Sequence, residues 1–201
     1  MVVKHSILLV EDDPDLVEML YVYFRVQGYE VLTAGWGDAD DPGLSGLGRK
    51  QAFHAADILR SAPVTRAISS PMKRCQQTAD AFTSRSGMSF DTVNAVTEIP
   101  TPAGLDDRRA WLSGFMSGDW SAAPALLKDW RDGLIAAVEG LPDNTAVFTH
   151  FVAINAIVGH LNNVPGVTVF RPANCSITTL TRSGSALSVD KLGSEAATRI
   201  L

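Results

Sequence analysis

The stretch SSPMKRCQQTA, residues 69–79, combines residue types that suit the binding of an anion. The β-branched run at 64–69 predicts a short buried strand. Pro71 suits the first turn of a following helix, with Ser70 as its N-cap. Arg74 then falls in the first helical turn, where free backbone N–H groups and a guanidinium favour an anion such as phosphate. A surface arginine on an ordinary strand–helix unit shows the same pattern.

Two further side chains stand at predicted ends of strands. His150 follows the apolar run 145–149, and Glu98 follows another predicted strand and precedes Ile-Pro. The carboxyl ends of parallel strands share one edge of a sheet, where α/β proteins bind ligands. We therefore expect Arg74, His150 and Glu98 to converge at that edge. Taken singly, His150 also fits a hydrogen-bonded core histidine, and Glu98 fits a loop carboxylate.

The elements that must position these side chains alternate between strand and helix from residue 45 onward. Hydrophobic periodicity predicts helices at 46–60, 71–84, 123–139 and 151–162, a helical insert containing Trp111, Phe115 and Trp120, and strands at 64–69, 89–96, 145–149, 175–181 and 186–192. The first helix should bury Ala52, Ala55, Ala56 and Leu59. This alternation predicts an α/β fold, a three-layer α/β/α sandwich with a mostly parallel sheet, closed by a hairpin.

Three ordered motifs resemble those of the histidine phosphatase superfamily, which has the phosphoglycerate-mutase-like fold. They are the helix start LSGLGRKQA at 44–52, the turn SSPMKRCQQT at 69–78, and the strand that ends before His150. Residues 44 to about 192 follow the family's order and spacing. The resemblance implies hydrolysis of phosphomonoesters without a metal or other cofactor. It also implies that Arg74 and His150 bind phosphate, and that His150 and Glu98 are catalytic, with Glu98 as the proton donor.

The family also needs Arg-His-Gly at the end of its first strand, because that histidine is the nucleophile. By spacing, residues 31–35 occupy the first-strand position, with Thr33 and Ala34 in place of arginine and histidine. A second register sets the sequence RVQG, residues 25–28, against the motif, again without histidine. A third register uses His5, but an apolar strand follows it where a phosphate loop is expected.

Residues 1–34 resemble instead the first β-α-β of a response-regulator receiver domain, a flavodoxin-like unit. The strand at 6–10 ends in the acidic cluster 11–13, an amphipathic helix follows, and residues 28–34 predict a second strand. In receivers, such a cluster binds magnesium beside a phosphoacceptor aspartate on a third strand, but here the pattern stops at about Ala34. The cluster equally suits a solvated strand end that caps the next helix.

These resemblances together describe one α/β domain over residues 1–201. A receiver-like segment, 1–34, precedes a histidine-phosphatase-like segment, 35–201, so that receiver-like residues replace the phosphatase's own first strand. We interpret this arrangement as a natural fusion or a chimera.

Composition narrows the classes of partner. The chain has 201 residues, enough for one α/β core, with 46% hydrophobic and 19% charged residues. Its net charge of −5 gives no support for nucleic-acid binding, and no apolar run approaches the length of a membrane span. Cys75 and Cys175 fit reduced, half-buried residues of a cytoplasmic protein. The oligomeric state stays open.

Two functions are compatible with these observations. The first is a phosphomonoesterase, or its descendant, that keeps a pocket for phosphate or a small phosphorylated ligand but shows weak or no turnover because the nucleophile is missing. The second is a catalytically silent scaffold or phospho-ligand-binding protein, a pseudoenzyme with a receiver-derived N-terminus. The fold cannot separate them, because function depends on the site.

Overall fold

The computed structural model describes residues 5–11, 41–105 and 107–195. Their strands form one six-stranded sheet of order β3-β2-β4-β1-β5-β6. The strands are β1 (His5–Glu11), β2 (Arg66–Ser69), β3 (Asp91–Thr92), β4 (Thr145–Thr149), β5 (Ile177–Ser183) and β6 (Ala186–Lys191). Strands β3, β2, β4 and β1 run parallel, whereas β5 and β6 pair antiparallel. The predicted mostly parallel sheet with a closing hairpin is confirmed.

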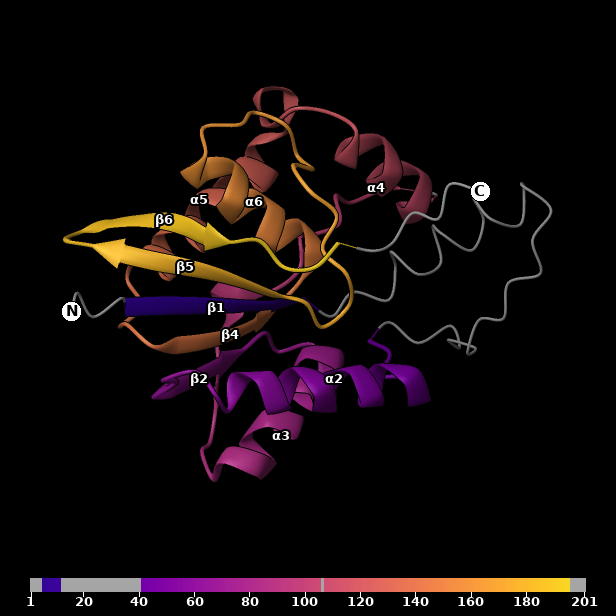
Figure 1. Ribbon diagram of the computed structural model, residues 1–201. Helices are drawn as coiled ribbons and strands as arrows, with labels where there is room; N and C mark the ends of the chain where they lie inside the picture. Colours follow the sequence, from indigo (N-terminus) through magenta and orange to yellow (C-terminus); the bar gives the residue numbers. More distant parts are fainter. Residues whose placement is uncertain (1–4, 12–40, 106, 196–201) are drawn as a thin grey trace, which may run out of the picture.

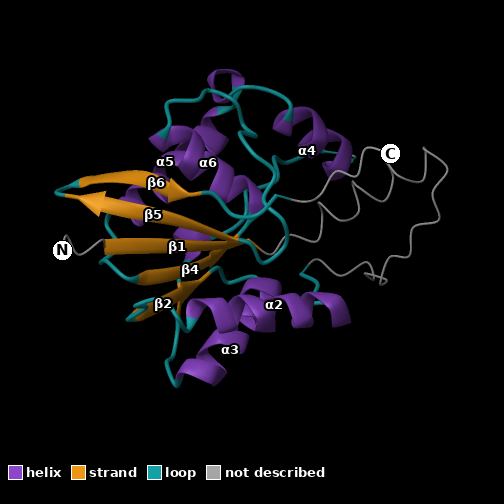
Figure 2. Cartoon of the chain, in the orientation of Figure 1, coloured by secondary structure: helices purple, strands orange, loops and turns teal. Residues whose placement is uncertain are grey.

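Helices cover both faces of this sheet (Figure 1). They are α2 (Gly46–Leu59), α3 (Lys73–Ser86), α4 (Arg108–Met116), α5 (Ala125–Glu139) and α6 (Phe151–Leu161), with 3-10 turns η1 (Asn94–Val96) and η2 (Trp120–Ala122). Figure 2 shows α2 and α3 on one side of the strands, and α5 and α6 on the other. Within the described ranges, no helix has the length and hydrophobicity that a membrane span needs.

Strand β4 connects the two layers of the core because its side chains alternate between the faces of the sheet. Ala146 and Phe148 pack in the cluster under α2 and α3, whereas Val147 packs in the cluster under α5 and α6. All five residues of β4 are buried, as expected for a strand covered on both faces. Helix α2 buries the four residues that periodicity predicts: Ala52, Ala55, Ala56 and Leu59.

Strand β1 lies between β4 and β5, with Glu11 opposite Thr149 in the parallel register. The sequence spacing predicts residues 31–35 for the first-strand position; the structure places His5–Glu11 beside β4 instead. A strand in the middle of the sheet favours a continuous apolar run, which residues 7–10 supply and the sequence VLTAG at 31–35 does not. The predicted strand at 6–10 is thus confirmed. Residues 25–28 and 31–35, like the rest of the receiver-like segment after Glu11, lie outside the described residues.

His5 lies at the amino end of β1, opposite Arg182 of β5. Six residue steps of extended chain, roughly 20 Å, separate it from Glu11 at the other end of the strand. His150 follows β4 at the edge near Glu11, so His5 is at the opposite edge of the sheet. The register that offers His5 as the nucleophile beside His150 is therefore wrong.

Two predicted boundaries also differ from the structure. Helix α3 begins at Lys73 with Met72 as its N-cap, because the Ser70 hydroxyl accepts a hydrogen bond from the Met72 N–H at 3.2 Å and closes a separate turn. The predicted strand 89–96 shortens to β3, whose two residues are exposed at the edge of the sheet, and continues as η1. Neither difference moves Arg74 out of the first turn of its helix.

Candidate functional site

The three side chains predicted to converge do so at the carboxyl ends of β2 and β4. Arg74 is the second residue of α3, which follows β2, and His150 is the N-cap of α6, directly after β4. His150 Nδ1 lies 3.0 Å from Arg74 Nη2 and 3.8 Å from Glu98 Oε2. Residues 76 and 52 positions apart in the chain thus meet around one imidazole.

These side chains are buried. Arg74 is 3% exposed, Glu98 6% and His150 0%. A charge removed from water is costly unless an opposite charge or hydrogen bonds replace the lost hydration. The guanidinium and the carboxylate both lie within 4 Å of Nδ1, so the buried cluster contains one charge of each sign.

The contacts of His150 define its tautomer. A guanidinium only donates hydrogen bonds, so the contact from Arg74 Nη2 makes Nδ1 the acceptor. The proton of the neutral imidazole is thereby assigned to Nε2, which donates to Ser70 Oγ at 2.7 Å. Both ring nitrogens are therefore hydrogen-bonded within the protein. Sequence patterns do not identify Ser70 as a partner of His150, because the Ser70 hydroxyl fits an N-cap equally well.

Cys75 completes the surroundings of the imidazole. Its sulfur lies 3.5 Å from Nε2, and its thiol donates to the Thr149 carbonyl at 3.4 Å. Cys75 and Cys175 are both buried, rather than half-buried as expected from the sequence. No local signal in the sequence indicates that Cys75 faces a histidine 75 residues away.

A hydrogen bond from β4 fixes the segment that carries Glu98. The Thr149 hydroxyl donates to the Val96 carbonyl at 2.7 Å, which ties η1 to the end of β4. Glu98 Oε1 then accepts a hydrogen bond from the Ile99 N–H at 2.9 Å. The other carboxylate oxygen is the one beside His150. Glu98 is thus held by the backbone and is not a freely rotating loop carboxylate.

Asp41 is a residue of the site that the sequence did not reveal. Its two carboxylate oxygens accept the Lys73 N–H at 3.0 and 2.9 Å, and Oδ1 lies 4.0 Å from Arg74 Nη1. Helix α3 has no acidic residue in its first turn and no side-chain cap from Met72. Asp41 therefore caps the helix from a distant segment, which local sequence patterns cannot predict.

Ser70, His150 and Glu98 superficially resemble a Ser–His–carboxylate triad. In such a triad, the imidazole nitrogen facing the serine must be unprotonated to accept its proton. Here Arg74 forces the opposite tautomer, with the proton already on Nε2. The arrangement therefore provides a neutral N–H donor, on His150, and a buried cation, Arg74, which can bind an oxyanion. Within the described residues, no three or more His, Cys, Asp or Glu gather in a way that could hold a metal ion.

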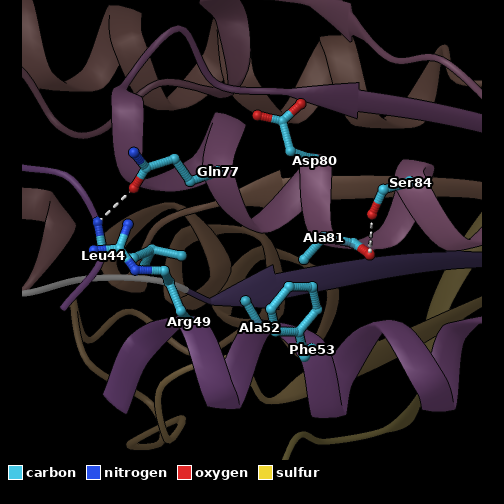
Figure 3. Close-up of a pocket in the computed structure, with 8 residues that line it drawn as sticks. All are labelled: Leu44, Arg49, Ala52, Phe53, Gln77, Asp80, Ala81 and Ser84. Atoms are coloured by element: carbon cyan, nitrogen blue, oxygen red, sulfur yellow. Dashed lines mark hydrogen bonds between the residues drawn. The ribbon is translucent and has the colours of Figure 1, made fainter. Parts of the chain in front are cut away.

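A pocket of about 280 Å³ lies elsewhere, between α2 and α3 (Figure 3). Its lining residues are Leu44, Arg49, Ala52, Phe53, Gln77, Asp80, Ala81 and Ser84. Gln77 Oε1 accepts the Leu44 N–H at 2.6 Å and so joins the start of α2 to α3. Arg74, His150 and Glu98 do not line this pocket, and we assign it no role in phosphate chemistry.

Comparisons with known proteins agree with this fold. Residues 30–103 match the model of the family described as Histidine phosphatase superfamily (branch 1). No curated protein matches the chain. Solved structures of phosphatases match with high coverage. A mycobacterial glucosyl-3-phosphoglycerate phosphatase has a TM-score of 0.65 at 18% identity, covering 96% of this chain and 100% of that one.

Two further structures have the same fold. A phosphoserine phosphatase from Entamoeba histolytica, in complex with 3-phosphoglyceric acid, has a TM-score of 0.66 at 15% identity, covering 94% of this chain and 96% of that one. A putative alpha-ribazole-5'-P phosphatase from Escherichia coli has a TM-score of 0.67 at 14% identity, covering 96% and 97%. The chain therefore has the phosphoglycerate-mutase-like fold of the histidine phosphatases.

Proposed function

We propose that this chain binds the phosphoryl group of a small phosphorylated ligand at Arg74 and His150, with weak or no turnover of phosphomonoesters. The observation that carries the proposal is the buried contact between Arg74 and His150, 3.0 Å long, at the carboxyl edge of the sheet. A guanidinium at the amino end of a helix favours an oxyanion through both its charge and its fork of donors. The phosphatases that share the fold support a phosphorylated ligand of small size.

Binding of the oxyanion changes the hydrogen bonds of His150. An oxyanion that takes over the Arg74 donors leaves Nδ1 without its present donor, and Nδ1 can then accept a proton. Glu98 Oε2, 3.8 Å away, compensates the resulting positive charge. Binding is thus coupled to proton uptake at His150, and the affinity should rise as pH falls.

Turnover requires an activated nucleophile, and the described residues near Arg74 do not provide one. Both nitrogens of His150 are hydrogen-bonded, Ser70 faces a protonated nitrogen, and His5 is at the other edge of the sheet. We propose that Glu98 and His150 hold the positions of the family's proton donor and phosphate contact without completing the reaction. A catalytically silent scaffold is the alternative, favoured by the closed hydrogen bonding of His150.

A titration with inorganic phosphate or vanadate, followed by NMR of backbone amides, tests phosphate binding. We expect saturable shifts at Arg74 and His150 with a dissociation constant of about 1 mM, roughly 4 kcal/mol. Arg74→Lys should weaken binding, whereas Arg49→Lys, on the wall of the α2–α3 pocket, should leave it unchanged. No saturable shift at Arg74 or His150 in the unmodified chain would favour the scaffold.

Hydrolysis of p-nitrophenyl phosphate tests the absence of turnover. We expect a rate no faster than in buffer, because losing a nucleophile that works as a unit with its partners removes several orders of magnitude. Any residual rate should be unchanged in Arg74→Ala, which identifies it as contamination. A rate that disappears in Arg74→Ala and persists in Arg49→Ala would show an active enzyme and contradict this part of the proposal.

A further inference from the structure

We propose that Asp41 makes the Arg74 site selective for phosphate ligands that carry an ammonium group near the phosphate, over ligands of the same size without one. This inference rests on the proposed binding of phosphate at Arg74 and names the class of ligand. The juxtaposition that carries it is the Asp41 carboxylate 4.0 Å from the guanidinium, at the amino end of α3.

Asp41 has acceptor capacity left for a ligand. Its carboxylate has about four lone-pair positions, and its hydrogen bonds within the described part of the chain use the single N–H of Lys73. The side chain is 44% exposed, in contrast to 3% for the Arg74 side chain. An incoming ligand can therefore contact Asp41 from solvent.

The charges of the described residues explain why an ammonium group helps. The charged groups of the site are the Arg74 guanidinium and the carboxylates of Asp41 and Glu98. The His150 imidazole is neutral according to its hydrogen bonds. A phosphate dianion beside Arg74 is thus repelled by Asp41. The exposed Lys73 ammonium makes no ion pair within the described structure, and solvent screens it.

An ammonium group on the ligand reverses the effect of Asp41. In O-phosphoethanolamine, two carbons separate the phosphate ester oxygen from the ammonium, a span similar to that of the Arg74–Asp41 pair. The phosphate then contacts the guanidinium while the ammonium contacts the carboxylate. Ethyl phosphate has the same phosphate and the same two carbons but lacks the charge. The two compounds therefore isolate the contribution of the ammonium.

The test measures both ligands against the unmodified chain and Asp41→Asn by NMR titration at low salt. Asparagine keeps an oxygen that can accept the Lys73 N–H but removes the charge. We expect the unmodified chain to prefer O-phosphoethanolamine by about threefold to fivefold, as for a partly exposed ion pair. The preference should fall to about one in Asp41→Asn and should shrink as salt is added. Asp80→Asn, the same charge change on the α2 side of α3, should keep the preference.

The possible outcomes distinguish failure of the proposed selectivity from failure of the proposed phosphate binding on which it rests. Equal affinity of the unmodified chain for both ligands overturns the selectivity and leaves phosphate binding intact. A preference that survives in Asp41→Asn also overturns it. Failure of both ligands to bind either protein overturns the proposed function together with the selectivity. If Asp41→Asn does not fold, Asp41→Ser, an uncharged residue that caps helices well, replaces it with the same expected loss.

Discussion

Helix α3 has two contrasting sides. Towards β4, Arg74 and Cys75 surround the buried imidazole of His150. Towards α2, Gln77, Asp80 and Ser84 line an open pocket of about 280 Å³ (Figure 3). The side with the open volume has solvated charges, whereas the side with the buried charges has tightly hydrogen-bonded side chains. The candidate functional site of this molecule therefore lies among buried, mutually hydrogen-bonded side chains and not in the open surface pocket.

The physical reason lies in the cost of removing polar groups from water. A buried donor or acceptor that loses its partner costs about 1–3 kcal/mol, and a charged group costs more. Arg74, Ser70 and His150 therefore depend on one another. Arg49 and Asp80 are exposed, and substituting either should change the free energy of unfolding little, because water replaces their contacts. Matched substitutions on the two sides of α3 test this difference.

The largest expected effect is that of Arg74→Met. Methionine keeps much of the packing volume but leaves His150 Nδ1 without its donor and removes the positive charge from the buried group that also contains Glu98. We expect a loss of about 2–3 kcal/mol in the free energy of unfolding. Arg49→Met on the pocket side should change it by less than about 0.5 kcal/mol. Urea denaturation measures both, and equal losses would remove the contrast between the two sides.

A smaller effect is expected for Ser70→Ala. The substitution removes the acceptor of the buried His150 Nε2–H at 2.7 Å and of the part-buried Met72 N–H at 3.2 Å. We expect a loss of about 1–2 kcal/mol. The control is Ser84→Ala, because within the described residues that hydroxyl donates to the Ala81 carbonyl of the same helix and accepts no hydrogen bond. A loss for Ser84→Ala as large as for Ser70→Ala would show that burial is not what distinguishes them.

Sequence reasoning located the elements of this fold where periodicity is strong. The buried face of α2 and the strand β4 were predictable because apolar residues recur at helical spacing in one and run continuously in the other. The meeting of Arg74 and His150 followed from the rule that parallel strands end at the same edge. Spacing alone set residues 31–35 in the first-strand position, whereas the more apolar run 7–10, within the predicted strand 6–10, lies there.

The details of the site were beyond the sequence for a different reason. Asp41 reaches Lys73 across 32 positions, and Ser70 reaches His150 across 80. Such contacts depend on how side chains meet after the elements have packed, and no local pattern encodes them. Ser70 shows the ambiguity most clearly. Its hydroxyl matched an N-cap by type, yet it serves both a turn at Met72 and the imidazole of His150.

The smallest expected effect belongs to Phe53→Leu, on the pocket wall. The Arg85 guanidinium lies 4.4 Å from the centroid of the Phe53 ring and donates to the Phe53 carbonyl at 3.1 Å. Leucine keeps an apolar side chain and the carbonyl, so only the cation–π contact is lost. At this exposed place we expect a loss of about 0.5–1 kcal/mol in the free energy of unfolding. Phe82→Leu, a substitution of the same type at a buried ring of α3, should cost more because it leaves a cavity. Equal losses of stability for Phe53→Leu and Phe82→Leu would show that the pocket wall contributes to stability as the core does. The two sides of α3 would then differ in shape alone.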